Sequence, residues 1–260
     1  MIKEELESIR IQSVSTPEMI ETILLIKGEM KMFYDPTFIL LIPAIIFTFY
    51  AQFKVQAIFR KYQNVRAASG QTGAQVAREI LDRSNLYDVP VELTPGTLSD
   101  HYDPRSRVLR LSPEVYHGCS LAAYGVAAHE TGHAIQHSES YMPLTLRNGI
   151  FPVASLGSNL GFFLFFIGII FGGGNNFLLD LGIILFSFFV AFTILTLPVE
   201  YNASNRALAI LGASGYLMQG EEVGGAKKVL NAAALTYVAS AATAILQLLR
   251  MLLLRGSRDD

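Results

Sequence analysis

The sequence predicts a mainly α-helical polytopic membrane protein, with about four transmembrane helices and a small α+β domain in the cytosol. Of the 260 residues, 51% are hydrophobic and only 16% are charged, whereas soluble domains carry about 25% charged residues. The mean hydropathy is +0.37, and the apolar residues gather in long stretches with almost no charge. The five histidines all lie between positions 101 and 137, so polar chemistry is concentrated between the apolar stretches.

The N-terminal segment, residues 1–31, differs in composition from the rest of the chain. It mixes charged and apolar residues and lacks the basic start and cleavage site of a signal peptide. Lys27-Gly28-Glu29 is what a ribosome-binding sequence would encode, and it directly precedes Met30. We therefore expect residues 1–31 to be an extension that is not native, with the natural start at Met30 or Met32.

Residues 36–53 predict the first transmembrane helix because they contain no charged side chain. A spanning helix needs roughly 17–25 residues, and this stretch meets the lower limit. Lys54, Arg60, Lys61 and Arg66 follow at once, and positive charge collects on the cytoplasmic side of membrane proteins. The chain after residue 54 is therefore expected in the cytosol.

Residues 54–147 have the composition of a soluble domain. Thr72 and Gln75 have the spacing of a capping box that opens a helix. Short strands are expected at 89–93, an edge strand because of Pro90, and at 108–111. These two strands would form a β-hairpin around a polar loop at 100–106. A short helix should follow Ser112, and Ser120 should cap a helix over 121–137.

A helical hairpin in the membrane is expected over 151–197, with spans at 151–171 and 177–197. A glycine- and asparagine-rich turn separates them, and Asp180 is the only charged residue between Arg147 and Glu200. We place Asp180 at the level of the lipid headgroups outside the cell. Residues 198–228 predict a helix and a polar loop, and residues 229–254 a fourth span that leaves the C-terminus outside.

The pattern H-E-x-x-H at 129–133 is the strongest chemical signal in the sequence. On a helix, His129 and His133 are four residues apart and lie on one face, so both can bind one metal ion. Glu130 can then act as general base for a water molecule that the metal activates. The motif predicts that residues 54–147 form a zincin-like catalytic domain.

A catalytic zinc ion takes three protein ligands, so the motif needs one more. Glu200 fits best, because the predicted membrane hairpin returns it to the side on which the motif helix ends. Glu221 and Glu222 are rivals, but they lie in what we interpret as a solvated loop. His137 follows on the same helix and is assigned to the surface or to the surroundings of the ligands.

Five segments of the chain together resemble the YugP-like family of bacterial membrane zinc metallopeptidases. They are residues 33–36, 69–73, 100–105, 126–137 and 197–208. The resemblance implies one Zn²⁺ per chain and a proteolytic activity. The segment 200–204 is also similar to the E-x-x-A-D segment of HtpX and the CAAX prenyl proteases, in which the glutamate binds zinc. Ser204 replaces the aspartate that supports a motif histidine there, a role for which Asn202, Asn205 and Asp100 are the substitutes.

These observations predict a multi-pass cell-membrane endopeptidase that cleaves membrane or unfolded proteins at the cytosol-membrane boundary. The developing oxyanion needs a donor besides the metal, and Arg206, His101 and Tyr201 are the candidates. The expected partners are protein or peptide substrates and the lipid bilayer, while oligomers or membrane-protease partners are left open. The net charge of -2 gives no support for nucleic-acid binding.

Two alternatives stay open at the level of the sequence. A site-2-type intramembrane protease would carry H-E-x-x-H inside a spanning helix and use an aspartate as third ligand, for which Asp180 is the candidate. A non-catalytic membrane scaffold or adaptor could retain the metal-binding fold, although it would have no need of Glu130.

Overall fold

The computed structural model describes residues 36–171 and 176–257, so the predicted extension at 1–31 lies outside the described residues. The chain divides into two compact units, Met1–Ile39 and Leu40–Asp260. Only residues 36–39 of the first unit are described, and they begin the short 3-10 helix η1 (Pro36–Leu41). The second unit carries the remaining elements and the site.

Among the described residues, four helices are long and apolar enough to cross a membrane, which agrees with the predicted number. They are Pro36–Gln63, made of η1 and α2 (Ile42–Gln63); Met142–Phe171, made of α6 (Met142–Leu156), the π-helical turn η2 (Gly157–Gly161) and α7 (Phe162–Phe171); α8 (Phe177–Ala213); and α9 (Glu221–Gly256).

All four helices extend beyond the spans that hydropathy predicts. The first continues to Gln63 rather than ending at 53, and the second begins at Met142 rather than 151. α8 continues through Pro198 to Ala213, and α9 begins at Glu221 rather than 229. Hydropathy registers only the apolar part of a helix, whereas the helix itself continues for as long as its polar end packs on protein. The expectation of a solvated loop around Glu222 is wrong: Glu222 is buried in the first turn of α9 and accepts hydrogen bonds from the backbone N–H groups of Ala68 and Met218.

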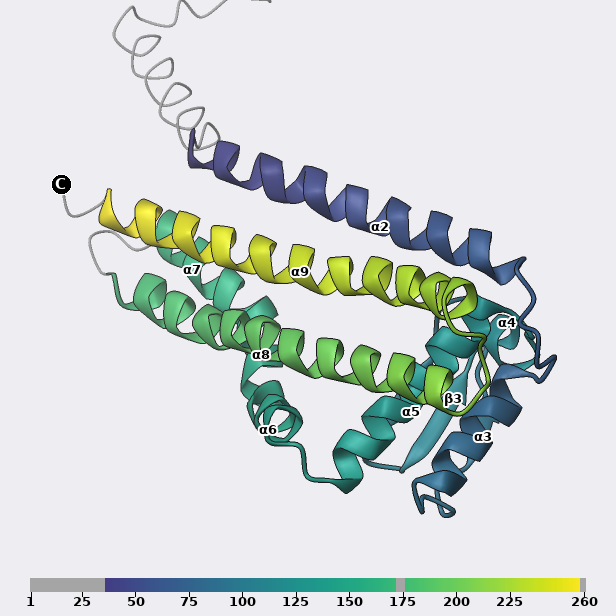
Figure 1. Ribbon diagram of the computed structural model, residues 1–260. Coiled ribbons are helices and arrows are strands. Elements are labelled where there is room, and N and C mark those ends of the chain that lie inside the picture. Colours follow the sequence, from purple (N-terminus) through teal and green to yellow (C-terminus); the bar gives the residue numbers. More distant parts are fainter. Residues whose placement is uncertain (1–35, 172–175, 258–260) are drawn as a thin grey trace, which may run out of the picture. The chain divides into compact units, whose positions relative to one another are not determined.

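The helices of the second unit pack around α8 and α9. α9 runs beside both α2 and α8, while α6 and α7 contact α8 (Figure 1). Glycine allows the closest approach: a Cβ at Gly182 would lie 2.6 Å from the Gly161 carbonyl oxygen. Small residues at such crossings are typical of helices that associate in membranes.

The small sheet has three strands in the order β1-β3-β2. β1 (Val91–Leu93) is parallel to β3 (Val108–Leu111), and β2 (His101–Asp103) is antiparallel to β3. The predicted pairing of 89–93 with 108–111 as a hairpin is therefore wrong, and the hairpin consists of β2 and β3. The reason is tertiary: Asp100 accepts hydrogen bonds from the Ser112 N–H and hydroxyl, which holds the expected polar loop against β3. β1 is an edge strand, as Pro90 suggested.

Helix α5 (Leu121–Ser138) links the domain to the membrane helices, because it packs against α3 (Gly73–Arg83), α8 and α9. The predicted caps are present: Ser120 accepts a hydrogen bond from the Ala123 N–H, and Thr72 and Gln75 form a capping box. The short helix α4 (Pro113–Tyr116) begins after Ser112 as expected. The H-E-x-x-H motif thus lies on the helix that packs directly against α8 and α9.

Candidate metal centre

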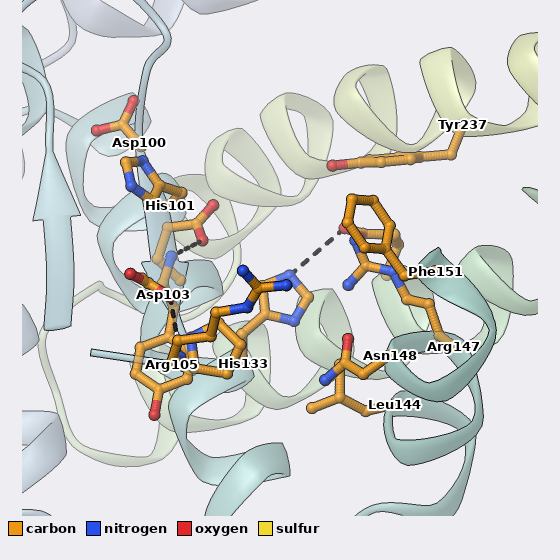
Figure 2. Close-up of a pocket in the computed structure, with 14 residues that line it drawn as sticks. Asp100, His101, Asp103, Arg105, His133, Leu144, Arg147, Asn148, Phe151 and Tyr237 are labelled. Carbon is orange, nitrogen blue, oxygen red and sulfur yellow. Dashed lines mark hydrogen bonds and ion pairs between the residues drawn. The ribbon is translucent and has the colours of Figure 1, made fainter. Parts of the chain in front are cut away.

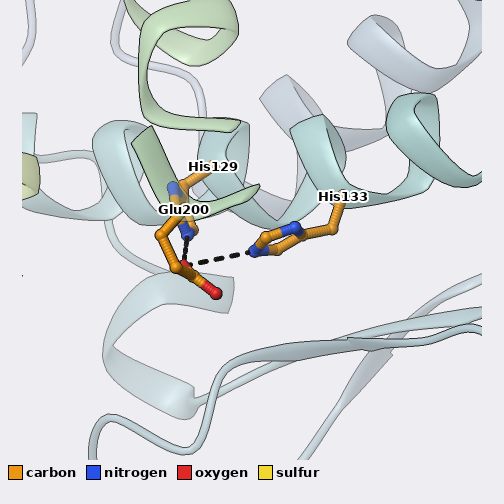
Figure 3. A group of neighbouring side chains, drawn as sticks. All are labelled: His129, His133 and Glu200. Atoms are coloured by element: carbon orange, nitrogen blue, oxygen red, sulfur yellow. Dashed lines mark hydrogen bonds and ion pairs between the residues drawn. The ribbon is translucent and has the colours of Figure 1, made fainter. Parts of the chain in front are cut away.

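Three side chains from two helices converge on one point (Figure 3). His129 and His133 lie one turn apart on α5, and Glu200 extends from α8. The Glu200 Oε2 atom is 3.2 Å from His129 Nε2 and 3.6 Å from His133 Nε2. Candidate ligand atoms of the three residues all lie within 4.8 Å of one another. Sequence reasoning expected these three residues, and the fold brings them together.

The donor set fits a tetrahedral zinc ion. Ligand atoms about 2.0–2.1 Å from zinc at tetrahedral angles are about 3.3–3.4 Å apart, close to the separations of Glu200 Oε2 from the two ring nitrogens. Two imidazoles and one carboxylate leave a fourth position for water, as in catalytic rather than structural zinc sites. The group could therefore hold one metal ion.

Gly132, inside the motif, allows α5 and α8 to approach this closely. A Cβ at this position would lie 3.0 Å from the carbonyl oxygen of Ala203 and 3.3 Å from its Cα atom. Any larger residue would push α8 away. Because Ala203 lies about one turn after Glu200 on α8, the glycine helps to bring the third ligand close to the histidines.

Hydrogen bonds hold the histidine rings with their Nε2 atoms toward Glu200. The Nδ1 atom of His133 is 2.9 Å from Gln136 Oε1, and the amide nitrogen of this buried glutamine donates to Val199 O and Asn202 Oδ1. With Nδ1–H donating to the glutamine oxygen, the Nε2 lone pair of His133 is free to bind metal. Asn202 therefore supports the site through Gln136.

Ser204 contacts the other histidine ring. Its Oγ atom is 3.1 Å from His129 Nδ1, where it can accept the N–H hydrogen bond. Ser204, which stands where HtpX has an aspartate, thus contacts a motif histidine directly, and no substitute is needed for this contact. Asp100, one of the substitutes considered, is engaged with Ser112 instead.

Glu130 is held between α5 and the sheet. Its Oε2 atom accepts a hydrogen bond of 3.1 Å from the Tyr102 N–H on β2. Burial raises the pKa of the Glu130 carboxyl, an effect that His129 and His133 oppose. Burial alone would lower the pKa of His133, but Glu200 and Glu130 raise it overall. A carboxyl with a raised pKa is suited to accept a proton and return it.

Glu130, Glu200 and His133 line a cavity of about 660 Å³ (Figure 2). One wall is the segment from Asp100 to Arg105, which contains β2, and the other walls come from α6, α8 and α9. The lining residues are Asp100, His101, Tyr102, Asp103, Pro104, Arg105, Glu130, His133, Leu144, Arg147, Asn148, Phe151, Glu200 and Tyr237.

The predicted oxyanion donors lie in different environments. His101 lines the cavity, with its Nδ1 atom 2.8 Å from Ser99 O. Tyr201 is 45% exposed, and Arg206 pairs with Glu139 at 2.7 Å. Neither of these two is among the described residues that line the cavity, so their roles stay predictions that no contact supports.

Arg147 on α6 and Tyr237 on α9 are among the polar residues of the cavity that sequence reasoning missed. Each left a weak signal. Arg147 is the last charge before the long uncharged stretch, and Tyr237 brings a hydroxyl group into the last apolar run. His137, expected at the surface or around the ligands, lies 2.9 Å from the Tyr102 hydroxyl through its Nδ1 atom.

Asp180 does not join the metal-binding group. It forms an ion pair of 2.8 Å with Arg255 near the far end of α8. Glu200 lies 20 residues further along the same helix, which corresponds to about 30 Å at 1.5 Å per residue. A third ligand at Asp180, which the site-2-type alternative needs, does not fit this arrangement.

Comparison with known proteins agrees with the chemistry of this group. Residues 37–256 match the family described as "Putative neutral zinc metallopeptidase". The chain is 53% identical over 223 residues to "Putative membrane protease YugP" of Bacillus subtilis (strain 168), covering 85% of this chain and 97% of the relative. No solved structure matches the chain.

Proposed function

Because the chain belongs to the putative neutral zinc metallopeptidase family, we propose that it is a membrane-bound zinc endopeptidase whose catalytic residues are His129, Glu130, His133 and Glu200. The observation that carries this proposal is the convergence of His129, His133 and Glu200, together with the opening of His133, Glu200 and the neighbouring Glu130 into one cavity. A bound Zn²⁺ would polarise the substrate carbonyl and make a water molecule acidic enough to attack near neutral pH.

Glu130 performs the proton transfers of peptide hydrolysis in this proposal. Its carboxylate takes one proton from the attacking water as the new C–O bond forms at the carbonyl carbon. It then gives this proton to the leaving amine nitrogen as the C–N bond breaks, so one product ends in a carboxyl group and the other in an amine. The Tyr102 N–H orients the carboxylate for both steps.

The substrate backbone is proposed to lie along β2. This strand is at the edge of the sheet and lines the cavity. Its Tyr102 N–H points away from β3 toward Glu130. In a strand the N–H and C=O of one residue point to the same side, so the Tyr102 carbonyl is available to an extended peptide. Such pairing fixes the peptide backbone without requiring a particular sequence.

The position of the cavity supports cleavage where chains enter or leave the bilayer. Leu144, Arg147 and Asn148 line it from the first turns of α6, and the uncharged part of that helix begins directly after Arg147. The cavity thus lies at the level at which the apolar spans begin. The basic residues Lys54, Arg60 and Lys61 at the end of α2 support a cytoplasmic location.

A cleavage assay with an active-site variant tests the proposal. We expect wild type with zinc to cleave fluorescein-labelled casein, an unfolded protein, in detergent micelles. Glu130→Gln should retain zinc and lose at least about 100-fold in rate, because general-base catalysis typically contributes 10²–10⁴-fold. Equal rates for the two proteins would contradict the enzyme proposal and favour a scaffold that retained the metal site.

The metal content of two carboxylate variants tests the ligand assignment. Elemental analysis should find about one zinc per chain in wild type and in Asp180→Ala, and a large loss in Glu200→Ala, because a site with three protein ligands would keep only two. Asp180→Ala is the matched control, since it removes a carboxylate from the same helix. Zinc loss in Asp180→Ala alone would favour the site-2-type arrangement.

A further inference from the structure

Two polar side chains from the membrane helices enter the cavity beside the metal-binding group. Arg147 comes from α6 and Tyr237 from the middle of α9, and both line the cavity together with Glu130, His133 and Glu200. Figure 2 shows the Tyr237 ring extending from α9 with its hydroxyl group over the cavity. The two residues therefore belong to the reaction space and not to the outer surface of the helices.

Arg147 is held in place without satisfying all its donors. Its guanidinium carbon lies 5.5 Å from the centre of the Phe192 ring, a cation–π arrangement that fixes the plane of the group. Its Nε atom is buried and has no hydrogen-bond partner among the described residues. Leaving a buried donor unpaired destabilises the protein. A ligand with an acceptor oxygen in the cavity would remove this destabilisation.

The reaction itself produces such an oxygen. When water adds to the peptide carbonyl, its oxygen gains a negative charge that preorganised donors stabilise strongly where water is excluded. Glu130 and Glu200 are acceptors and cannot supply these donors. His101, Arg105 and Asn148 are donors of the cavity, but all three are exposed. Half-buried Arg147 and Tyr237 are the better placed pair, because a hydrogen bond is stronger where the dielectric constant is low.

We propose that Arg147 and Tyr237 donate hydrogen bonds to the substrate carbonyl oxygen as it becomes negative, and so form the oxyanion-binding pair of this enzyme. The assignment rests on the proposed peptidase function and names the donors that this function requires. It also makes the packing of α6 and α9 on α8 a condition for catalysis, since each of these two helices contributes one donor.

The test uses Tyr237→Phe and Arg147→Gln in the full-length, zinc-loaded protein. Tyr50→Phe and Arg60→Gln are matched controls, because both residues lie on α2 and neither lines the cavity. An internally quenched peptide taken from the casein site that wild type selects gives kcat and KM. We expect kcat to fall about 100-fold in each cavity variant, as for the loss of one oxyanion donor, with KM within about 3-fold and zinc content unchanged. The controls should match wild type.

Binding of a transition-state analogue gives a readout that does not depend on turnover. A phosphinic peptide of the same sequence carries a tetrahedral anion where the oxyanion would form. The affinity of the phosphinic peptide should fall in both cavity variants by about the same factor as kcat/KM. The substrate peptide itself can be measured in proteins that also carry Glu130→Gln and so do not cleave it. Its affinity should not change when Tyr237→Phe or Arg147→Gln is added. Unchanged affinity for the phosphinic peptide in both variants would overturn the assignment.

The pattern of outcomes separates this assignment from the function on which it rests. If wild type and Glu130→Gln are equally inactive, the peptidase proposal fails and the assignment falls with it. If wild type cleaves and both cavity variants cleave at its rate, only the assignment is wrong. A rise in KM alone, confined to peptides with a free C-terminal carboxylate and absent from amidated ones, would overturn it in favour of carboxylate binding by Arg147.

Discussion

At the scale of single residues, the centre depends on neutral partners for both histidines. His133 is paired with the Gln136 amide and His129 with the Ser204 hydroxyl, at 2.9 and 3.1 Å. In many zinc enzymes a carboxylate takes this place, where it fixes the tautomer and raises the basicity of the ligand. A hydroxyl fixes the tautomer but adds no charge. Ser204 is therefore a point at which the affinity for zinc can be changed in either direction.

We predict that Ser204→Ala lowers the affinity for zinc about 10-fold, at the lower end of the usual effect of such partners, because His129 loses the acceptor that orients its ring. Ser204→Asp should bind zinc at least as tightly as wild type. Competition with a chelator of known affinity measures both. Ser187→Ala is the control, since that serine lies on the same helix and its hydroxyl donates a hydrogen bond to Ile183 O. Wild-type affinity in Ser204→Ala would show that the contact does not support the ligand.

At the scale of elements, the turn between β2 and β3 shapes the wall of the cavity. Asp103 ends β2 and accepts hydrogen bonds from the Ser106 hydroxyl at 2.6 Å and the Arg105 N–H at 2.9 Å. These bonds lower the pKa of Asp103 from 3.8 to about 2. A lowered pKa means that the ionised carboxylate stabilises the turn above pH 3.8 and that this contribution is lost as the pH falls through about 2.

Ser106→Ala should raise the pKa of Asp103 toward its ordinary value, because the hydroxyl is the main cause of the shift. The Asp103 carboxylate of this variant would then take up its proton at a higher pH than in wild type, and its contribution to the stability of the turn would be smaller. Carboxyl ¹³C NMR of aspartate-labelled protein, with the resonance assigned through Asp103→Asn, follows the titration directly. Ser106→Thr keeps a hydroxyl and should titrate near wild type. A midpoint that does not move in Ser106→Ala would exclude this hydrogen bond as the cause.

At the scale of the second unit, the proposed catalytic groups and the candidate membrane helices form one structure. Glu200, Arg147 and Tyr237 come from three candidate spans, and only the motif and the β2 segment come from the intervening domain. In the proposed membrane enzyme, the site would therefore have a fixed position relative to the bilayer. The basic end of α2 predicts that it faces the cytosol and that the chain after α9 lies outside.

Cysteine labelling tests this topology. In a Cys119→Ser background, which removes the single native cysteine, Thr97→Cys marks the domain and Ser257→Cys the end of α9; both positions are exposed. A membrane-impermeant maleimide should label position 257 in intact spheroplasts and position 97 only after permeabilisation. The reverse pattern would place the catalytic cavity outside the cell.

Much of this protein follows from patterns that act over a few residues. The four-residue spacing of His129 and His133 places both rings on one helix face, and the caps at Thr72 and Ser120 were predicted from side chains that bond within one turn. The four apolar stretches were equally evident, because a spanning helix needs little beyond its own composition. Glu200 was expected at the site because the membrane hairpin had to return to the side from which it started.

Contacts between distant segments were decided only by the tertiary structure. The pairing of β1 in parallel with β3 depends on how Asp100 anchors the segment before β2, and no alternation of side chains encodes it. Arg147 and Tyr237 lie in helices whose composition predicts only membrane insertion. Their approach to Glu130 results from how closely α5, α6, α8 and α9 pack, with Gly132 against Ala203 as one determinant. The distance between these side chains depends on how the helices of the whole unit fit together. A pattern within a few residues of sequence therefore cannot predict it.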